Sequence, residues 1–201
     1  MNKKILNHFK KHDLLLHSYA LKVGVITLKK DYPKNYFVRL CRSISGQQLS
    51  GASAEAIFTR FKKLYPKGIN PDEVIKTSHE KIRLVGMSNN KVSYLKNLAQ
   101  AVVDGSLRLE MLDKLSNVEI VKNLTKIKGI GPWTVEMFLM FTLGREDVFS
   151  HGDLGLKNGL KKIYGFKKNP STKTVEKIIK KWSPYKTYAC RILWESLELT
   201  D

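Results

Sequence analysis

A short turn with two glycines lies in Leu124-Thr-Lys-Ile-Lys-Gly-Ile-Gly-Pro-Trp-Thr134, between two stretches that have the apolar spacing of helices. Gly129 and Gly131 can adopt backbone conformations that side chains disfavour, and the proline after them suits the first turn of a helix. A phosphate can approach such a backbone closely, because no Cβ is in the way and the N–H groups of the next helix point outward. An ordinary turn between helices could contain the same glycines. The flanking charges of Lys126 and Lys128 favour a phosphate site.

A second candidate functional residue is the carboxylate Asp153, which precedes an apolar helical stretch in Asp147-Val-Phe-Ser-His-Gly-Asp-Leu-Gly-Leu156. Aspartate is a favoured N-cap residue, so this pattern by itself favours a structural role. His151 is the nearest candidate proton donor, with an exposed loop histidine as the alternative.

These segments resemble the helix–hairpin–helix (HhH-GPD) DNA glycosylases, whose signature is such a hairpin followed by a Gly/Pro-rich loop and a catalytic aspartate. Ile44-Ser-Gly-Gln-Gln-Leu-Ser50 is similar to the Gln-rich turn of that superfamily. Val85-Gly-Met-Ser-Asn-Asn-Lys-Val-Ser-Tyr-Leu95 resembles its Gly-x-Ser-x-x-Lys helix start. Trp182-Ser-Pro-Tyr-Lys-Thr-Tyr-Ala189 and Trp194 resemble the C-terminal helices of its alkyladenine branch, the 3-methyladenine DNA glycosylase II family.

The resemblance implies an enzyme that hydrolyses the N-glycosidic bond of alkylated purines, such as 3-methyladenine or 7-methylguanine, in base excision repair. Asp153 would be its catalytic residue, stabilising the oxocarbenium-like sugar and assisting water. An alkylated purine already carries positive charge and leaves without a general acid, which suits a site with one carboxylate.

Two tryptophans would form the base pocket. Trp133 occupies the position where bifunctional relatives carry the lysine that forms a Schiff base, so we expect hydrolysis without a lyase step. Its π face would attract a cationic base. Trp194 matches another pocket aromatic of the branch, while Met137 and Glu195 stand where some relatives have further aromatics.

A base in a duplex must be rotated out of the stack, and the gap must be filled. The resemblance assigns this role to Gln47, Gln48 and Leu49, without saying which of them intercalates. The alternative is that the two glutamines are surface residues and Leu49 is core, with Ser50 capping the next helix. Phosphates would be bound by the hairpin and by a lysine, namely Lys126, Lys128, Gly129, Gly131, Thr134 and Lys91. Four further cations could hold phosphates on either side of the rotated nucleotide, namely Lys96, Arg39, Arg42 and Arg60.

The composition agrees with a nucleic-acid partner. The 201 residues include 36 Lys and Arg against 18 Asp and Glu, a formal net charge of +18. Two cysteines, Cys41 and Cys190, exclude an iron–sulfur cluster built by one chain, and we expect both to be buried thiols. We expect neither metal nor cofactor. A soluble monomer acting on double-stranded DNA is predicted, with no membrane association and no obligate protein partner, in the cytoplasm at the nucleoid or in a nucleus.

Helical spacing dominates the chain and predicts an all-α fold. Expected helices cover residues 14–21, 36–45, 50–64, 90–103, 118–125, 133–143, 154–164, 175–182 and 185–199, with short ones starting at Pro71 and Ser78. The resemblance implies two helical lobes with the active site in the cleft between them. One lobe would be residues 34–150, with the helix–hairpin–helix at about 118–143, and the other residues 1–33 with 151–201.

Two other functions remain open. A uracil or oxidised-base glycosylase of the same superfamily would share these motifs, because specificity depends on pocket shape. A non-catalytic helix–hairpin–helix module would share the hairpin and the charge, but it would need neither Asp153, nor Trp133, nor the glutamine turn.

Overall fold

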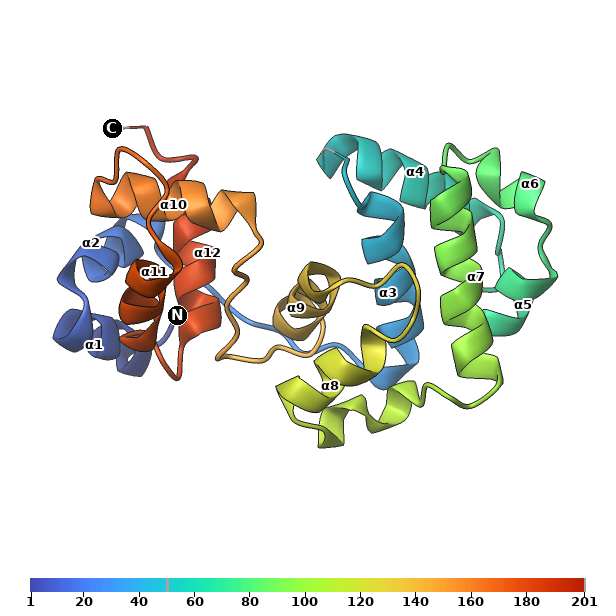
Figure 1. The fold of residues 1–201 in the computed structure, drawn as a ribbon, viewed down its shortest axis with the longest axis horizontal. Helices are drawn as coiled ribbons and strands as arrows, with labels where there is room; N and C mark the ends of the chain where they lie inside the picture. The colour runs from blue at the N-terminus through green and yellow to red at the C-terminus, as the bar shows by residue number, and fades with distance from the viewer. Residues whose placement is uncertain (50, 201) are drawn as a thin grey trace. The chain divides into compact units, whose positions relative to one another are not determined.

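The computed structural model describes residues 1–49 and 51–200, and all regular elements within them are helices (Figure 1). This confirms the predicted all-α fold. Backbone contacts divide the chain into two units. The central unit is Asp31–Leu143, and the terminal unit joins Met1–Lys30 to the chain from Gly144 onward.

The central unit is built around helix α3. Its helices are η1 (Pro33–Asn35), α3 (Tyr36–Gly46), α4 (Gly51–Lys63), α5 (Pro71–Lys76), α6 (His79–Arg83), α7 (Asn89–Val103), η2 (Leu109–Lys114), α8 (Asn117–Leu124) and α9 (Pro132–Phe141). Helix α3 contacts α4, α7 and α9, and it buries Leu40, Cys41 and Ile44 among them. The α8–α9 pair forms the predicted helix–hairpin–helix, and a Ser116–Glu119 capping box starts its first helix.

The terminal unit is built around helix α12. Its helices are α1 (Lys3–His12), α2 (Leu14–Val23), α10 (Leu154–Tyr164), α11 (Thr172–Lys180) and α12 (Lys186–Ser196). Helix α12 contacts α10 and α2, with Ala189, Cys190 and Leu193 fully buried. Both cysteines of the chain are buried and unbridged, as predicted.

Helix α1 was not anticipated from the sequence. It buries just Ile5 and Phe9 within a segment rich in lysine and histidine, so its apolar pattern is short. Its start signal is Asn2, whose side chain accepts the Ile5 N–H. None of the described helices is long and apolar enough to cross a membrane.

The division between the units differs from the expected boundaries near residues 34 and 150. Residues 144–150 were expected in the helical lobe but belong to the terminal unit. Thr187 of α12 explains this, because its N–H donates to the Glu146 carbonyl at 2.8 Å and its hydroxyl to the Arg145 carbonyl at 2.6 Å. The Val148 N–H donates back to the Thr187 Oγ1 at 3.1 Å. These bonds fasten the segment to α12.

Candidate active site and nucleic-acid interface

Asp153 is the N-cap of α10 and is 9% exposed. Its Oδ1 accepts the Leu156 backbone N–H at 2.8 Å, the bond expected of an N-cap. The same oxygen accepts the indole N–H of Trp194 at 2.9 Å. The carboxylate is therefore held by donors from two helices, α10 and α12. It can act as an oriented negative charge at the N-terminus of α10.

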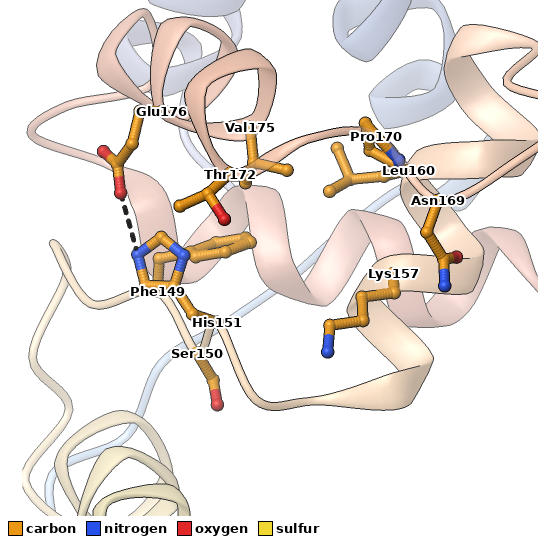
Figure 2. A pocket seen from close by; sticks show the side chains of 10 residues that line it. All are labelled: Phe149, Ser150, His151, Lys157, Leu160, Asn169, Pro170, Thr172, Val175 and Glu176. Carbon is orange, nitrogen blue, oxygen red and sulfur yellow. Dashed lines mark ion pairs between the residues drawn. The ribbon is translucent and has the colours of Figure 1, made fainter.

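The segment before Asp153 is fixed on its other side by aromatic packing. The Phe149 ring lies 6.0 Å from the Trp182 ring and 5.0 Å, edge to face, from the His151 ring. The His151 Nε2 lies 3.2 Å from a carboxylate oxygen of Glu176 on α11. Figure 2 shows the two side chains directed toward each other. This contact with Glu176 favours the alternative that His151 is a loop residue without a role as a proton donor.

A hollow of about 380 Å³ lies beside this segment. Figure 2 shows the side chains that line it. Its lining residues are Phe149, Ser150, His151, Lys157, Leu160, Asn169, Pro170, Thr172, Val175 and Glu176. Asp153 and Trp194 are not among them. The hollow is therefore separate from the candidate catalytic carboxylate.

The two hairpin glycines have different surroundings. Gly129 has φ +106°, and a Cβ there would lie 2.0 Å from the Cγ of Tyr94, so both conformation and packing require glycine. Gly131 has φ −90°, and a Cβ there would meet nothing within 4 Å. It is exposed and has no side chain to cap α9. Gly131 is free to face a ligand outside the chain, whereas Gly129 serves the fold.

The structure brings together three of the segments identified in the sequence. A hollow of about 400 Å³ is lined by the glutamine turn, by the start of α7 and by the hairpin. Its residues are Gln47, Gln48, Ser88, Asn90, Lys91, Tyr94, Gly131, Trp133 and Thr134. Asn97 of α7 also donates its amide to the Lys128 carbonyl at 3.2 Å. Sequence patterns gave no signal for Tyr94 or Asn97 as supports of the hairpin.

The three candidate wedge residues differ in what they contact. The Gln47 amide donates to the Gly129 carbonyl at 2.9 Å and to Thr134 Oγ1 at 3.2 Å, so it braces the hairpin. Gln48 is exposed with φ +58°, an uncommon conformation for a residue with a side chain. Leu49 is 39% exposed, contrary to the core alternative. Ser50 lies outside the described residues.

Most cations expected on phosphate have partners within the chain. Lys91 donates to the Ser45 carbonyl at 3.0 Å, and burial lowers the pKa of its ammonium. The other four are equally engaged: Lys96 with the Ile75 and Thr77 carbonyls, Arg39 with Asp31, Arg42 with Glu55 and Arg60 with the Val85 carbonyl. Lys126 and Lys128 are exposed beside the hairpin. Thr134 is 2% exposed, so its hydroxyl supports the turn.

The two tryptophans of the expected base pocket belong to different units. Trp133, in the central unit, is 42% exposed and also lines a hollow of about 320 Å³ with Met137 and Phe141, which follow it at helical spacing on α9. Trp194 lies on α12 of the terminal unit and is bonded to Asp153. Their joint pocket remains a prediction, as does the cleft expected between the lobes. The sequence gave no signal for the Trp194 hydrogen bond, because 41 residues separate its ends.

Comparison with known families agrees with these features. The HhH-GPD superfamily of base excision DNA repair proteins matches residues 41–184, which include the glutamine turn, the hairpin and Asp153. The chain belongs to this superfamily. The HhH-GPD resemblance seen in the sequence is thereby confirmed.

Individual members of the superfamily match nearly the whole chain. DNA-3-methyladenine glycosylase 1 of Schizosaccharomyces pombe is 37% identical over 171 residues, 84% of this chain and 75% of that protein. The alkylbase DNA glycosidase-like protein mag2 of the same organism is 31% identical over 96% of this chain and 92% of its own length. The solved structure of the S. pombe 3-methyladenine DNA glycosylase in complex with abasic DNA has a TM-score of 0.90 at 34% identity and covers 98% of both chains. A Bacillus halodurans DNA-3-methyladenine glycosidase has a TM-score of 0.84 at 35% identity, covering 97% of this chain and 89% of its own.

Proposed function

We propose that this protein is a monofunctional DNA glycosylase that hydrolyses the N-glycosidic bond of alkylated purines in double-stranded DNA. The observation that carries the proposal is Asp153, an aspartate held by two donors at the start of α10, in the position of the superfamily's catalytic residue. The names of its relatives support alkylated bases as the substrate class. We further propose that it acts as a monomer on chromosomal DNA, at the nucleoid or in a nucleus.

Cleavage of the glycosidic bond builds positive charge on the deoxyribose. The Asp153 carboxylate would stabilise this charge and assist the water that attacks the sugar. Its orientation is set before substrate binds, so little reorganisation is needed in the transition state. An alkylated purine is a good leaving group because it is already cationic, and the half-exposed Trp133 offers a π face to such a base.

Base rotation would be assisted from the glutamine turn. We assign the apolar wedge to Leu49, which is exposed, and the contact with the widowed base to Gln48, since the Gln47 amide is already bonded to the hairpin. The left-handed Gln48 backbone is the kind of strain that collects at functional sites. Phosphate binding would fall to Gly131 and the start of α9, with Lys126 and Lys128 adding charge.

The absence of a lyase step follows from Trp133, which replaces the amine that a Schiff base requires. We expect the product strand to keep its backbone at the abasic site. A covalent protein–DNA adduct trapped by borohydride would contradict this assignment.

Base release tests the proposal directly. The protein is incubated with methylated duplex DNA, and the released bases are separated by chromatography, with the Asp153→Asn protein as the control. We expect 3-methyladenine and 7-methylguanine from the unaltered protein alone. DNA containing uracil or 8-oxoguanine is tested in parallel, because release from these would favour a different member of the superfamily. Binding without release of any base would favour a non-catalytic module and reject the enzyme.

A further inference from the structure

We propose that Trp194 is a positioning residue, whose indole N–H sets the orientation of the Asp153 carboxylate for the reaction. This proposal rests on the proposed function of Asp153. It replaces the base-stacking role that the sequence suggested for Trp194 with a role that acts through Asp153.

Asp153 Oδ1 accepts hydrogen bonds from two helices. The Leu156 N–H belongs to the helix that Asp153 caps, so this bond orients the side chain relative to α10 alone. The Trp194 N–H reaches the same Oδ1 from α12. Rotation of the carboxylate plane then breaks or bends one of the two bonds, and charged acceptors make strong bonds. The indole therefore ties the carboxylate to a second helix, α12, in addition to the helix that Asp153 caps.

Gly155 provides independent evidence that this contact is built into the packing. A Cβ on Gly155 would lie 2.8 Å from both Cδ1 and Nε1 of Trp194 and 3.1 Å from Asp153 Oδ1. Its φ is not in the left-handed region, so the backbone itself would accept another residue. Glycine is needed there to leave room for the indole beside the carboxylate.

A second glycine brings the two helices close. Gly159 lies one turn further along α10, and a Cβ there would meet the Leu193 carbonyl oxygen at 2.6 Å and the Leu193 Cβ at 2.8 Å. Leu193 directly precedes Trp194 on α12. Gly155 and Gly159 thus allow α12 to pack close to α10, so that the Trp194 side chain can reach Asp153.

Activity measurements separate positioning from stacking. The Trp194→Phe variant keeps an aromatic ring and loses the N–H, and Gly155→Ala displaces the indole. We expect each to lower single-turnover excision about tenfold or more, the value of a hydrogen bond to a charged group, while affinity for abasic DNA stays within about twofold. The loss is expected to be equal for 3-methyladenine and 7-methylguanine. The matched control is Trp182→Phe, which removes the same kind of bond from Asp13.

A double-mutant cycle supplies the decisive comparison. In an Asp153→Asn background the orienting bond has lost its charged acceptor, so Trp194→Phe is expected to add less than about twofold. A stacking residue would act independently of Asp153, and its loss would persist in full. A persisting loss, or a Trp194→Phe rate equal to that of the unaltered protein, overturns the proposal.

A spectroscopic test does not depend on activity. The three tryptophans give three indole N–H signals in a ¹H–¹⁵N correlation spectrum, and Trp→Phe variants assign them. We expect Asp153→Asn to move the Trp194 signal upfield, because a neutral acceptor replaces a charged one, and to leave the Trp182 signal in place. An unmoved Trp194 signal refutes the hydrogen bond. If the unaltered protein releases no base at all, the proposed function fails, and this spectrum still decides whether the bond exists.

Discussion

Asp13 and Asp153 look alike both in sequence and in local structure. Asp13-Leu-Leu-Leu16 and Asp153-Leu-Gly-Leu156 each start a helix of the terminal unit, with the aspartate as a buried N-cap. In both, Oδ1 accepts the N–H three residues later, and a tryptophan indole donates to the carboxylate at 2.9 Å. An N-cap pattern with an indole partner therefore does not distinguish a structural aspartate from the one proposed to be catalytic.

The two sites differ in how the donors are distributed. At Asp13, the Leu16 N–H uses Oδ1, while the Trp182 indole and the Tyr164 hydroxyl both use Oδ2, at 2.9 and 2.5 Å. At Asp153, the Leu156 and Trp194 donors converge on Oδ1. Trp182 is fully buried, whereas Trp194 is partly exposed. Asp13 thus has donors on both oxygens and a fully buried indole partner, whereas the indole partner of Asp153 is partly exposed, and this difference in burial can be tested.

The largest effect is expected from Asp153→Asn. Asparagine is itself a favoured N-cap residue, and its carbonyl oxygen can accept at the position of Oδ1, so stability is expected to change little. The lost charge opposes the oxocarbenium ion, and we expect single-turnover excision to fall about a hundredfold or more, while DNA binding persists. Quenched-flow excision at saturating enzyme measures this. A rate close to that of the unaltered protein would show that Asp153, like Asp13, is only a helix N-cap.

The reverse result is expected from Asp13→Asn. Its donors are divided between two oxygens, and an amide can accept at one of these positions only. We expect a loss of about 2 kcal/mol in the free energy of unfolding, or roughly 4–8 °C in Tm, with an unchanged excision rate. Urea denaturation of both Asp→Asn proteins side by side provides the comparison. Equal stability of the two variants would contradict the distinction drawn from the buried partners of Asp13.

The two hairpin glycines of the central unit can be compared in the same way, since one is expected to serve ligand binding and the other the fold. Gly131→Val has room within the chain and an extended backbone that suits valine, so the protein is expected to fold normally and bind DNA about tenfold more weakly. Gly129→Val meets Tyr94 and is expected to unfold more easily. Binding titrations at two salt concentrations, with Lys128→Ala as control, separate backbone contact from charge, since only the lysine variant lowers the salt slope. Normal affinity of folded Gly131→Val would reject the phosphate site.

The smallest effect concerns alkaline pH. Burial, the hydrogen bond to Asp13 and the charge of Asp13 raise the pKa of the Tyr164 phenol. The folded protein keeps this proton where the unfolded chain has lost it, so the contribution is complete below about pH 10 and is lost as the pH rises further. We expect Tyr164→Phe to flatten the decline of unfolding free energy above pH 10, measured by urea titration. Excision at neutral pH is expected to stay the same, because the Tyr164 hydroxyl donates to Asp13 and not to the proposed catalytic aspartate.

Much of the fold and part of the site were predictable because their signals are local. The start of α10 at Asp153 and the capping of α8 by Ser116 depend on bonds that span three residues. Turns are similarly local, and the glycine hairpin was found between its two helices. Helix α1 was missed because two buried side chains are too few to show a period. The internal partners of Arg39, Arg42 and Lys91 were missed because sequence shows that a cation is present without showing what faces it.

The sequence by itself determined that Asp153 begins a helix, that another helix starts at Leu14 and that a glycine turn joins α8 to α9, since these features depend on neighbours within one helical turn. The tertiary structure alone decided what each feature faces. Trp182 and Tyr164 reach Asp13 across 169 and 151 residues, and Trp194 reaches Asp153 across 41. Contacts at such separations are set by helix packing, which no local pattern encodes, and they bury one capping aspartate among Trp182 and Tyr164 and hold the other from α12.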